Sequence, residues 1–297
     1  TTALINDVTQ RITYRNDTPA GDATLRFTLS DGTDNTTADV TVTSDTIYVT
    51  NSTDTAVIDA SDGVSFSEAV AIAAADATGS QTIVFDSTLA STVLTVDSVS
   101  LNESLTFDTG AASGISLTGG TLTLGAATTQ TFTSGSGDTA TLASTLAGSG
   151  ALTKAGDGTL TLSGTNTYTG ITTISAGTLS VTGETAGATT VDFGATLTGS
   201  GTLGGSVFIA EGGTLSPGSS TGTLTIEGDL DMNAGTLVVE INGTTPGTDY
   251  DQIIVNGAVT FINSMVLSVT HGYVPGGGDS YVIIVNDGVD AISGTFD

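Results

Sequence analysis

The chain has 297 residues, with 31 acidic side chains against four basic ones and a formal net charge of −27. Such an acidic surface repels nucleic acid, anionic lipid and acidic polysaccharide, so the composition argues against those partners. Cysteine is absent, which excludes disulfide bonds and thiol chemistry. The chain contains 60 Thr and 40 Gly. Because Thr is β-branched and suits a pleated surface, we expect an all-β protein.

The first segment, residues 1–52, is expected to form strands joined by turns. Apolar and polar residues alternate with period two over 11–15, 23–29 and 39–49. The stretch ITYRNDTPAGDATLRFTLSDG resembles the C-terminal half of a cadherin-like or immunoglobulin-like repeat of large bacterial surface adhesins. A complete sandwich of that kind needs about seven strands, and only three or four are predicted here. The segment is therefore part of a divided domain, or its strands lie against the fold that follows.

Three carboxylates lie close together in this first segment. Asp31, Asp34 and Asp39 stand within DGTDNTTAD. Carboxylate oxygens are hard ligands of the kind that Ca²⁺ prefers, although the twelve-residue EF-hand loop is not present. We therefore predict calcium as a candidate metal at these three residues, with a solvated acidic turn as the alternative. No other cofactor is expected.

One helical pattern follows, and we expect a helix near 65–77. Ser65 with Glu68 three residues later forms a capping box. An apolar face is predicted for Val70, Ala71, Ala74 and Ala75. The stretch VSFSEAVAIAAADATGSQTIVFD is similar to the beginning of many bacterial right-handed β-helices. Because the open end of a solenoid exposes apolar side chains and strand edges, we expect this helix to cap it. A surface helix in a loop is the alternative.

Residues 53–242 carry an internal repeat. The phrase Gly-Thr-Leu and its variants recur at Leu122, Leu142, Leu160, Leu179, Leu197 and Leu215, with a nearly constant step. This period of about 19 residues suits one turn of a parallel β-solenoid, whose coils bury their apolar side chains only by stacking. We expect these six leucines to stack in register inside, with Thr and Ser facing water. Leucine-rich repeats have a similar period but need a helical segment and a ladder Asn in each repeat.

A resemblance to a known family is carried by GALTKAGDGTLTLSGTNTYTGITTISAGTLSV, within residues 148–181. This stretch resembles the autotransporter-associated β-strand repeat of Gram-negative passenger domains. The resemblance implies a right-handed parallel β-helix that is secreted or displayed on the cell surface. Residues 243–297 resemble the C-terminal part of such passengers and are expected to form a C-terminal cap. Since no signal peptide and no apolar run of membrane-spanning length is present, we expect a processed product or fragment without membrane insertion.

Two pairs of carboxylates are candidates for chemistry. Asp229 and Asp231 stand two residues apart, as do Asp249 and Asp251. Residues i and i+2 of a strand share a face, and two nearby carboxylates can serve as acid and base on a glycoside. Both pairs can equally lie in turns. Enzymes that act on acidic glycans need cationic side chains, and Lys154 is the single base after residue 26. We therefore do not expect an enzyme.

The predicted function is structural: a non-enzymatic passenger or stalk with an adhesive surface. Expected partners are a host or neighbouring-cell surface, a glycan, or a further copy of the chain. One alternative is a β-helix enzyme acting on neutral glycans, although His271 is the single histidine and no nucleotide or metalloprotease motif occurs. The other alternative is a Thr-rich ice-binding or surface-binding solenoid. Thr-x-Thr ranks do recur, but turns of varying length are expected to break them.

Overall fold

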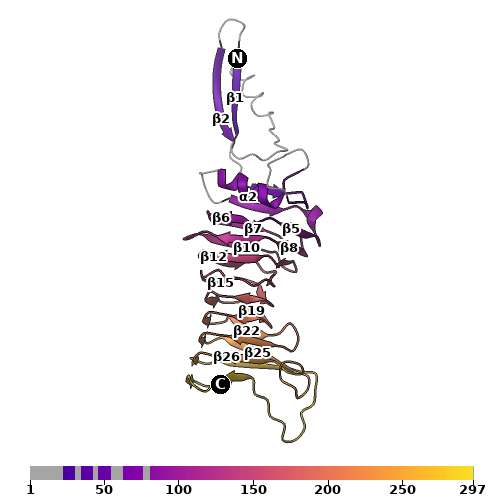
Figure 1. Cartoon of the computed structure of the whole chain (residues 1–297), viewed down its shortest axis with the longest axis vertical. Coiled ribbons are helices and arrows are strands. Elements are labelled where there is room, and N and C mark those ends of the chain that lie inside the picture. Colours follow the sequence, from indigo (N-terminus) through magenta and orange to yellow (C-terminus); the bar gives the residue numbers. More distant parts are fainter. Residues whose placement is uncertain (1–22, 31–34, 43–45, 55–62, 76–80, 297) are drawn as a thin grey trace, which may run out of the picture.

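The computed structural model describes residues 23–30, 35–42, 46–54, 63–75 and 81–296. Figure 1 shows strand after strand stacked along one axis, with α2 (Phe66–Ala75) near one end and a hairpin beyond it. The described fold is all-β apart from α2 and the 3-10 turn η1 (Ser87–Leu89). The predicted fold class, a right-handed parallel β-helix, is confirmed.

The rungs of the solenoid have three sides. Sheet I forms the first side, with strands β3 (Thr46–Val49), β4 (Gln81–Phe85), β7 (Leu105–Asp108), β10 (Thr129–Thr133), β13 (Ala151–Ala155), β15 (Thr172–Ile174), β18 (Thr189–Val191), β21 (Val207–Ile209), β24 (Leu230–Asn233), β27 (Val259–Ile262) and β30 (Ile292–Ser293). Sheet II forms the second side, with strands β5 (Val93–Val96), β8 (Ile115–Gly119), β11 (Thr139–Leu142), β14 (Thr159–Leu162), β16 (Thr178–Val181), β19 (Thr196–Gly199), β22 (Thr214–Pro217), β25 (Thr236–Ile241) and β28 (Val266–His271).

The third side is divided into two shorter sheets. Sheet III contains β6 (Val99–Leu101), β9 (Thr121–Leu124) and β12 (Thr145–Gly148). Sheet IV contains β17 (Glu184–Thr185), β20 (Thr202–Leu203), β23 (Thr223–Ile226), β26 (Gln252–Val255) and β29 (Ile284–Asn286). Between them, residues 163–171 replace the third strand of one rung. Asn166 lies in this gap, and its side chain contacts the rungs on both sides.

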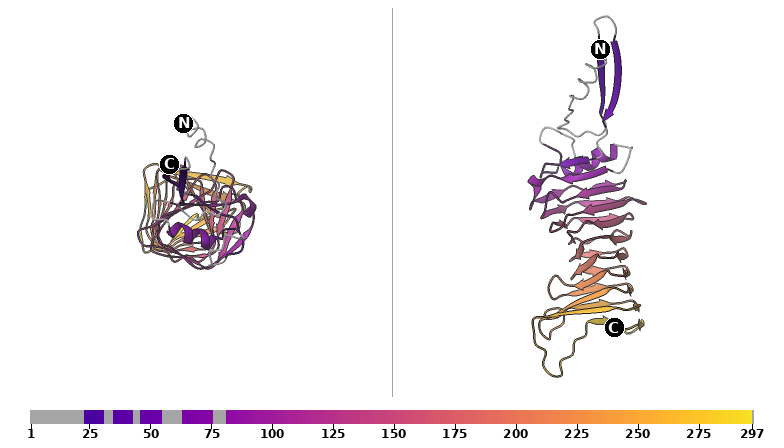
Figure 2. Two further views of the ribbon diagram at one scale, coloured as in Figure 1. Left: turned by 90° about the horizontal axis from the view of Figure 1, so that it is seen from above. Right: turned by 180° about the vertical axis from the view of Figure 1, so that it is seen from behind.

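At the N-terminal end, β1 (Ala23–Ser30) and β2 (Asn35–Val42) pair antiparallel. This hairpin lies beyond α2 in both side views of the molecule (Figures 1 and 2). The next strand, β3, already pairs in parallel with β4 as the first strand of sheet I. The likeness of residues 1–52 to a cadherin-like repeat stays a prediction, since the described part comprises this hairpin and β3.

The capping box is confirmed in both directions. The backbone N–H of Ser65 donates to Oε2 of Glu68 at 2.7 Å, and the N–H of Glu68 donates to Oγ of Ser65 at 3.4 Å. Seen along the axis, α2 lies across the outline of the rungs (Figure 2, left). The Phe66 ring stacks on Phe85 with ring centroids 6.1 Å apart and lies 5.9 Å from the ring of Phe107. The helix therefore covers apolar side chains of the first rungs.

The predicted apolar face of this helix is wrong in three of its four residues. Ala71, Ala74 and Ala75 are exposed, and only Val70 is buried. The buried apolar residues are instead Phe66, Ala69, Val70, Ile72 and Ala73. Four of them, Phe66, Ala69, Val70 and Ala73, follow the i, i+3, i+4, i+7 pattern that starts at Phe66. The largest apolar side chain of the helix inserts into the core and so determines which face turns inward.

The predicted leucine stack is confirmed for four of its six members. All six leucines are buried. Leu160 pairs with Leu179, Leu179 with Leu197, and Leu197 with Leu215, so these four form one inward column of sheet II. The prediction is wrong for the other two. Leu142 pairs with Leu162 in a neighbouring column of sheet II, and Leu122 pairs with Leu146 in sheet III.

Unequal rung length explains this difference. In sheet II, Leu94 pairs with Leu117 and Leu117 with Leu142, so each of these early rungs is longer than the repeat period of the sequence. The middle rungs are shorter, as the spacing of Leu160, Leu179 and Leu197 shows. The long early rungs hold a third full strand in sheet III. They therefore contain the Leu phrase on more than one side, and equal spacing along the sequence does not mean equal position in the rung.

At the C-terminal end, strands from residues 243–297 continue the three sides in the same parallel order. β28 pairs with β25, β29 with β26, and β30 with β27. These last strands leave apolar side chains exposed at Val266, Val269 and Ile292. Within the described residues, none of the helices combines the length and the apolar character needed to span a membrane.

Candidate functional site

The outer face of sheet II carries a regular array of hydroxyl side chains. Strands β11, β14, β16, β19 and β22 each have Thr or Ser at the two positions that flank an inward residue, although Ser180 of β16 is itself buried. The first column contains Thr139, Thr159, Thr178, Thr196 and Thr214. The second contains Thr141, Thr161, Ser180, Thr198 and Ser216. We call these ten residues the threonine face.

The expectation that these Thr-x-Thr ranks are broken is wrong. Thr159 pairs with Thr178 and Thr161 with Ser180, and the same two-column register holds across all five rungs. The turns between strands vary in length, as the sequence indicates. The extra residues lie in the turns between strands, however, and the strands of sheet II stay paired leucine to leucine.

The threonine face is free of charge although the protein carries a net charge of −27. None of its ten positions holds an ionisable side chain. Four of these five strands follow a turn from sheet I that contains an acid: Asp138, Asp157, Asp192 or Glu211. Four carboxylates therefore lie along the corner between sheet I and sheet II, and the ten positions of the threonine face carry no charge.

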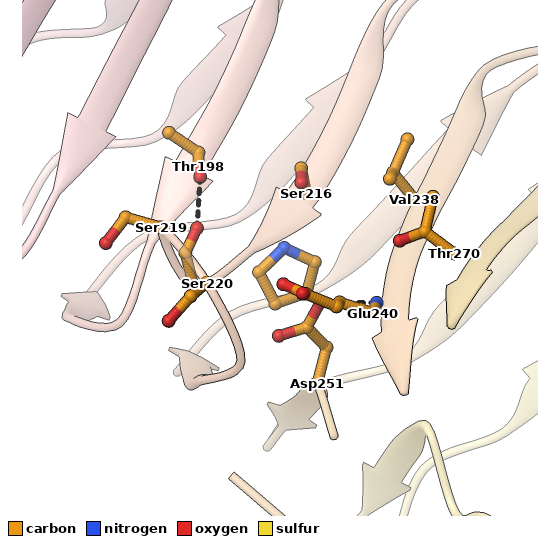
Figure 3. Close-up of a pocket in the computed structure, with 10 residues that line it drawn as sticks. Thr198, Ser216, Ser219, Ser220, Val238, Glu240, Asp251 and Thr270 are labelled. Atoms are coloured by element: carbon orange, nitrogen blue, oxygen red, sulfur yellow. Dashed lines mark hydrogen bonds between the residues drawn. The ribbon is translucent and has the colours of Figure 1, made fainter. Parts of the chain in front are cut away.

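A cavity of about 160 Å³ lies at the C-terminal end of the threonine face (Figure 3). Residues 218–222 fold back over this face to form it, and the Thr198 hydroxyl donates to the carbonyl of Gly218. Its lining consists of Thr198, Ser216, Pro217, Gly218, Ser219, Ser220, Val238, Glu240, Asp251 and Thr270. The cavity is thus rich in hydroxyl groups and contains two carboxylates.

Asp251 holds this loop in place. Its Oδ1 accepts the N–H of Gly222 at 2.9 Å, and its Oδ2 accepts the N–H of Glu240 at 2.7 Å. The residue is 2% exposed. Burial raises the pKa of the Asp251 carboxyl, the two backbone bonds oppose that shift, and the nearby Glu240 charge adds to it. Because both oxygens already accept backbone bonds, the carboxylate positions the loop.

The carboxylate pairs predicted from the sequence do not come together as a catalytic pair. Asp229 accepts the N–H of Ala258 at 2.9 Å, and Asp231 occupies an outward position of β24. Asp249 lies in a turn and accepts the N–H of Thr245 at 3.0 Å. The pair that the fold does bring together is Asp251 with Glu240. Sequence spacing carries no signal for it, because the two residues meet only when residues 242–250 fold back on β25.

The candidate calcium ligands fall largely outside the described residues. Asp31 and Asp34 are outside the described residues. Asp39 lies in β2, where its backbone pairs with that of Arg26, but its side chain is not described. Across the ranges that the structure does describe, no group of three His, Cys, Asp or Glu side chains is placed to hold a metal ion. His271 is exposed at the end of β28. A calcium site in the hairpin stays a prediction.

The single base of the solenoid points into the core. Lys154 lies between Phe132 and Ile174 in an inward column of sheet I. Its Nζ donates to the carbonyls of Ala155 at 2.8 Å, Gly156 at 2.7 Å and Ala176 at 3.3 Å. Burial lowers the pKa of Lys154 to about 8, opposed by the charge of Asp157. Its ammonium group binds backbone and faces no open surface.

Comparison with known proteins points to one repeat family. The family model of the passenger-associated-transport-repeat matches residues 152–181, which include β14, β15 and β16. A search of curated proteins finds no match to the chain. The matched residues lie within the stretch whose resemblance to passenger repeats is described above. This repeat is typical of autotransporter passengers and implies export to the cell surface or secretion.

Proposed function

We propose that this chain is a non-enzymatic passenger domain of a large bacterial surface protein, and that it acts as a stiff stalk. One observation carries the proposal. A buried column runs through Ile115, Ala140, Leu160, Leu179, Leu197, Leu215 and Leu237, with each residue paired to the next. Stacked rungs that share one core bend little, because each rung contacts its neighbours over all three sides. The passenger-associated repeat supports display outside the cell.

The finer proposal is that the stalk takes part in adhesion. The neutral threonine face offers a long flat area for contact with a neighbouring cell, a host surface, a glycan or a second copy of the chain. A role as an enzyme on anionic substrates finds no support in Lys154, whose ammonium group is committed to three carbonyls. The geometry therefore favours presentation of surface.

Display is tested with the parent protein in a Gram-negative host. Antibody raised against the purified chain is applied to intact cells, with a cytoplasmic protein as the control for lysis. We expect labelling of intact cells or recovery of the chain from the medium. Antigen found only after lysis contradicts the proposal.

Adhesion is tested by cell aggregation and by sedimentation of the chain at low and high salt. Residues 27–297 contain 28 acidic side chains and one basic side chain, so two copies of the chain repel each other at low salt. Salt screens this repulsion, so association is expected to strengthen as salt rises. Association that weakens with added salt contradicts the charge argument.

A further inference from the structure

We propose that the middle rungs of the solenoid, residues 163–206, open locally while the interior rungs on either side stay closed. These rungs contain β15 to β20 and lie halfway along the column in Figure 1. The stalk then consists of two more stable parts joined by a section that opens first. The inference concerns the relative stability of the rungs, so it does not depend on where the protein is displayed or what it contacts.

The backbone ladder is short in this section. β15 and β18 of sheet I have three residues each, and β17 and β20 of sheet IV have two each. Towards the N-terminal end, β10 and β12 have five and four residues, and towards the C-terminal end, β24 and β26 have four each. Because each paired residue contributes to the ladder, shorter strands mean fewer hydrogen bonds between the middle rungs.

Polar side chains occupy inward positions of the same section. In one inward column of sheet I, Leu152 is followed by Thr172 and Thr189, and the column becomes apolar again at Val207 and Leu230. All five side chains are buried. Two successive threonines thus interrupt an apolar stretch of the core, and they bury less apolar surface than leucines would.

Two inward hydroxyl groups of this section have no hydrogen bond. Oγ1 of Thr185 and Oγ1 of Thr189 are buried and have no partner among the described residues. Thr172, one rung before Thr189, instead bonds to the hydroxyl of Tyr168. A buried hydroxyl without a partner loses its bonds to water on folding, so closure of these rungs is less favourable.

Buried polar side chains nearer the N-terminal end differ in bonding or in position. Gln130 points inward, but its amide donates to the carbonyl of Glu103 at 2.7 Å and accepts the N–H of Leu105 at 3.2 Å. The hydroxyls of Ser134 and Ser144 also have no partner among the described residues, yet both serines lie in turns between strands. The middle section combines short strands with unpartnered hydroxyls at inward strand positions. Local opening is favoured where the ladder and the core are both weak.

The experiment is hydrogen exchange of the full 297-residue chain at low denaturant, resolved by mass spectrometry of peptides. End rungs fray in any solenoid, so the middle rungs are compared with interior rungs over 93–148 and 207–262. The test variant is Thr189→Val, which keeps the side-chain shape and removes an unpartnered hydroxyl. The matched control is Thr190→Val, because the adjacent residue of β18 points outward. Thermal melting followed by circular dichroism verifies that each variant is folded.

We expect amides of β15 to β20 to exchange about tenfold faster than those of the flanking interior rungs, after correction for intrinsic rates. Thr189→Val is expected to slow exchange in the middle rungs by about tenfold, because the closed state no longer buries that hydroxyl. Thr190→Val is expected to leave exchange there unchanged.

Equal protection of the middle and flanking rungs in the unmodified chain overturns the proposal. Unchanged or faster exchange of the middle rungs in Thr189→Val also overturns it, as does equal slowing by Thr190→Val. Surface display and adhesion are measured separately, so failure here leaves the proposed function standing.

Discussion

Oδ1 of Asn166 accepts the backbone N–H of Leu146, in the preceding rung, at 2.9 Å. Its Nδ2 donates to the carbonyl of Glu184, in the following rung, at 2.9 Å and to the carbonyl of Gly164 at 3.0 Å. One side chain thus bonds to the last strand of sheet III and to the first strand of sheet IV. These side-chain bonds add to the backbone bonds that residues 166–169 make to the same two rungs, where the third side of the solenoid has no full strand.

Asn166→Ala is expected to destabilise the protein by about 2–3 kcal/mol, because it leaves the buried N–H of Leu146 and two carbonyls without this partner. Equilibrium unfolding in guanidinium chloride measures the change. Asn256→Ala is the control, since Asn256 is exposed and donates to Glu227 at 2.7 Å on the surface. Its effect is expected to stay within about 0.5 kcal/mol. Equal effects of the two substitutions would show that Asn166 does not join the sheets.

Leu160→Asp is expected to destabilise the protein by several kcal/mol, because it places a charge without a partner in the buried column between Ala140 and Leu179. Thr161→Asp is the matched control, since the adjacent residue points outward. The midpoint of denaturant unfolding compares the two. A midpoint for Leu160→Asp that equals that of the control would mean that Leu160 faces solvent.

Lys154 is expected to make stability depend on pH in the alkaline range. Burial lowers its pKa in the folded protein to about 8, below the ordinary value of 10.5, so the unfolded chain binds the proton more tightly. Protonated Lys154 therefore destabilises the fold below pH 8, and the free energy of unfolding rises as pH increases from about 8 towards 10.5. Unfolding of the unmodified chain and of Lys154→Met is compared between pH 7 and 10.

The difference between the two Lys154 proteins isolates this group. Burial also raises the pKa of Tyr168 to about 12, but that tyrosine is present in both proteins and cancels in the difference. A difference that does not change with pH would mean that Lys154 keeps its ordinary pKa in the core.

Asp251→Asn is expected to release residues 218–222 from β25. An amide has one acceptor oxygen, so it cannot accept from Gly222 and Glu240 in the same way, and its NH₂ group faces an N–H donor. The loss is expected to be about 1–3 kcal/mol. Hydrogen exchange of the Gly222 and Glu240 amides reports it directly, with Asp231→Asn as the control. Unchanged protection of both amides in Asp251→Asn would contradict this role.

Much of the fold could be predicted because its physical signals are local and repeated. The regular recurrence of the Gly-Thr-Leu phrase predicts stacked rungs, and Ser65 with Glu68 predicts the start of the capping helix. The alternation of Thr with Leu also predicts which residues are buried. Each of these signals depends on spacing within one strand, one helical turn or one repeat.

Relationships between rungs could not be predicted in the same way. The partner of Leu142 depends on the length of the whole rung, which includes turns without a periodic pattern. The continuity of the threonine face depends on the same lengths. Asp251 meets Glu240 only because Ile241 pairs with Tyr250 and closes the intervening loop. Such contacts follow from the register of several strands together.

Disulfide formation between pairs of introduced cysteines tests this register most directly, because the natural chain contains no cysteine. Thr141 pairs with Thr161, and Thr159 lies two residues away on the same face. Cα atoms of the paired residues lie about 4.8 Å apart, within disulfide reach, whereas those of Thr141 and Thr159 are separated by about 8 Å. Thr141→Cys with Thr161→Cys is therefore expected to oxidise readily to an intramolecular disulfide, measured by intact mass after alkylation, while Thr141→Cys with Thr159→Cys stays reduced. The opposite preference would contradict the register on which the leucine column, the threonine face and the stiff stalk all depend.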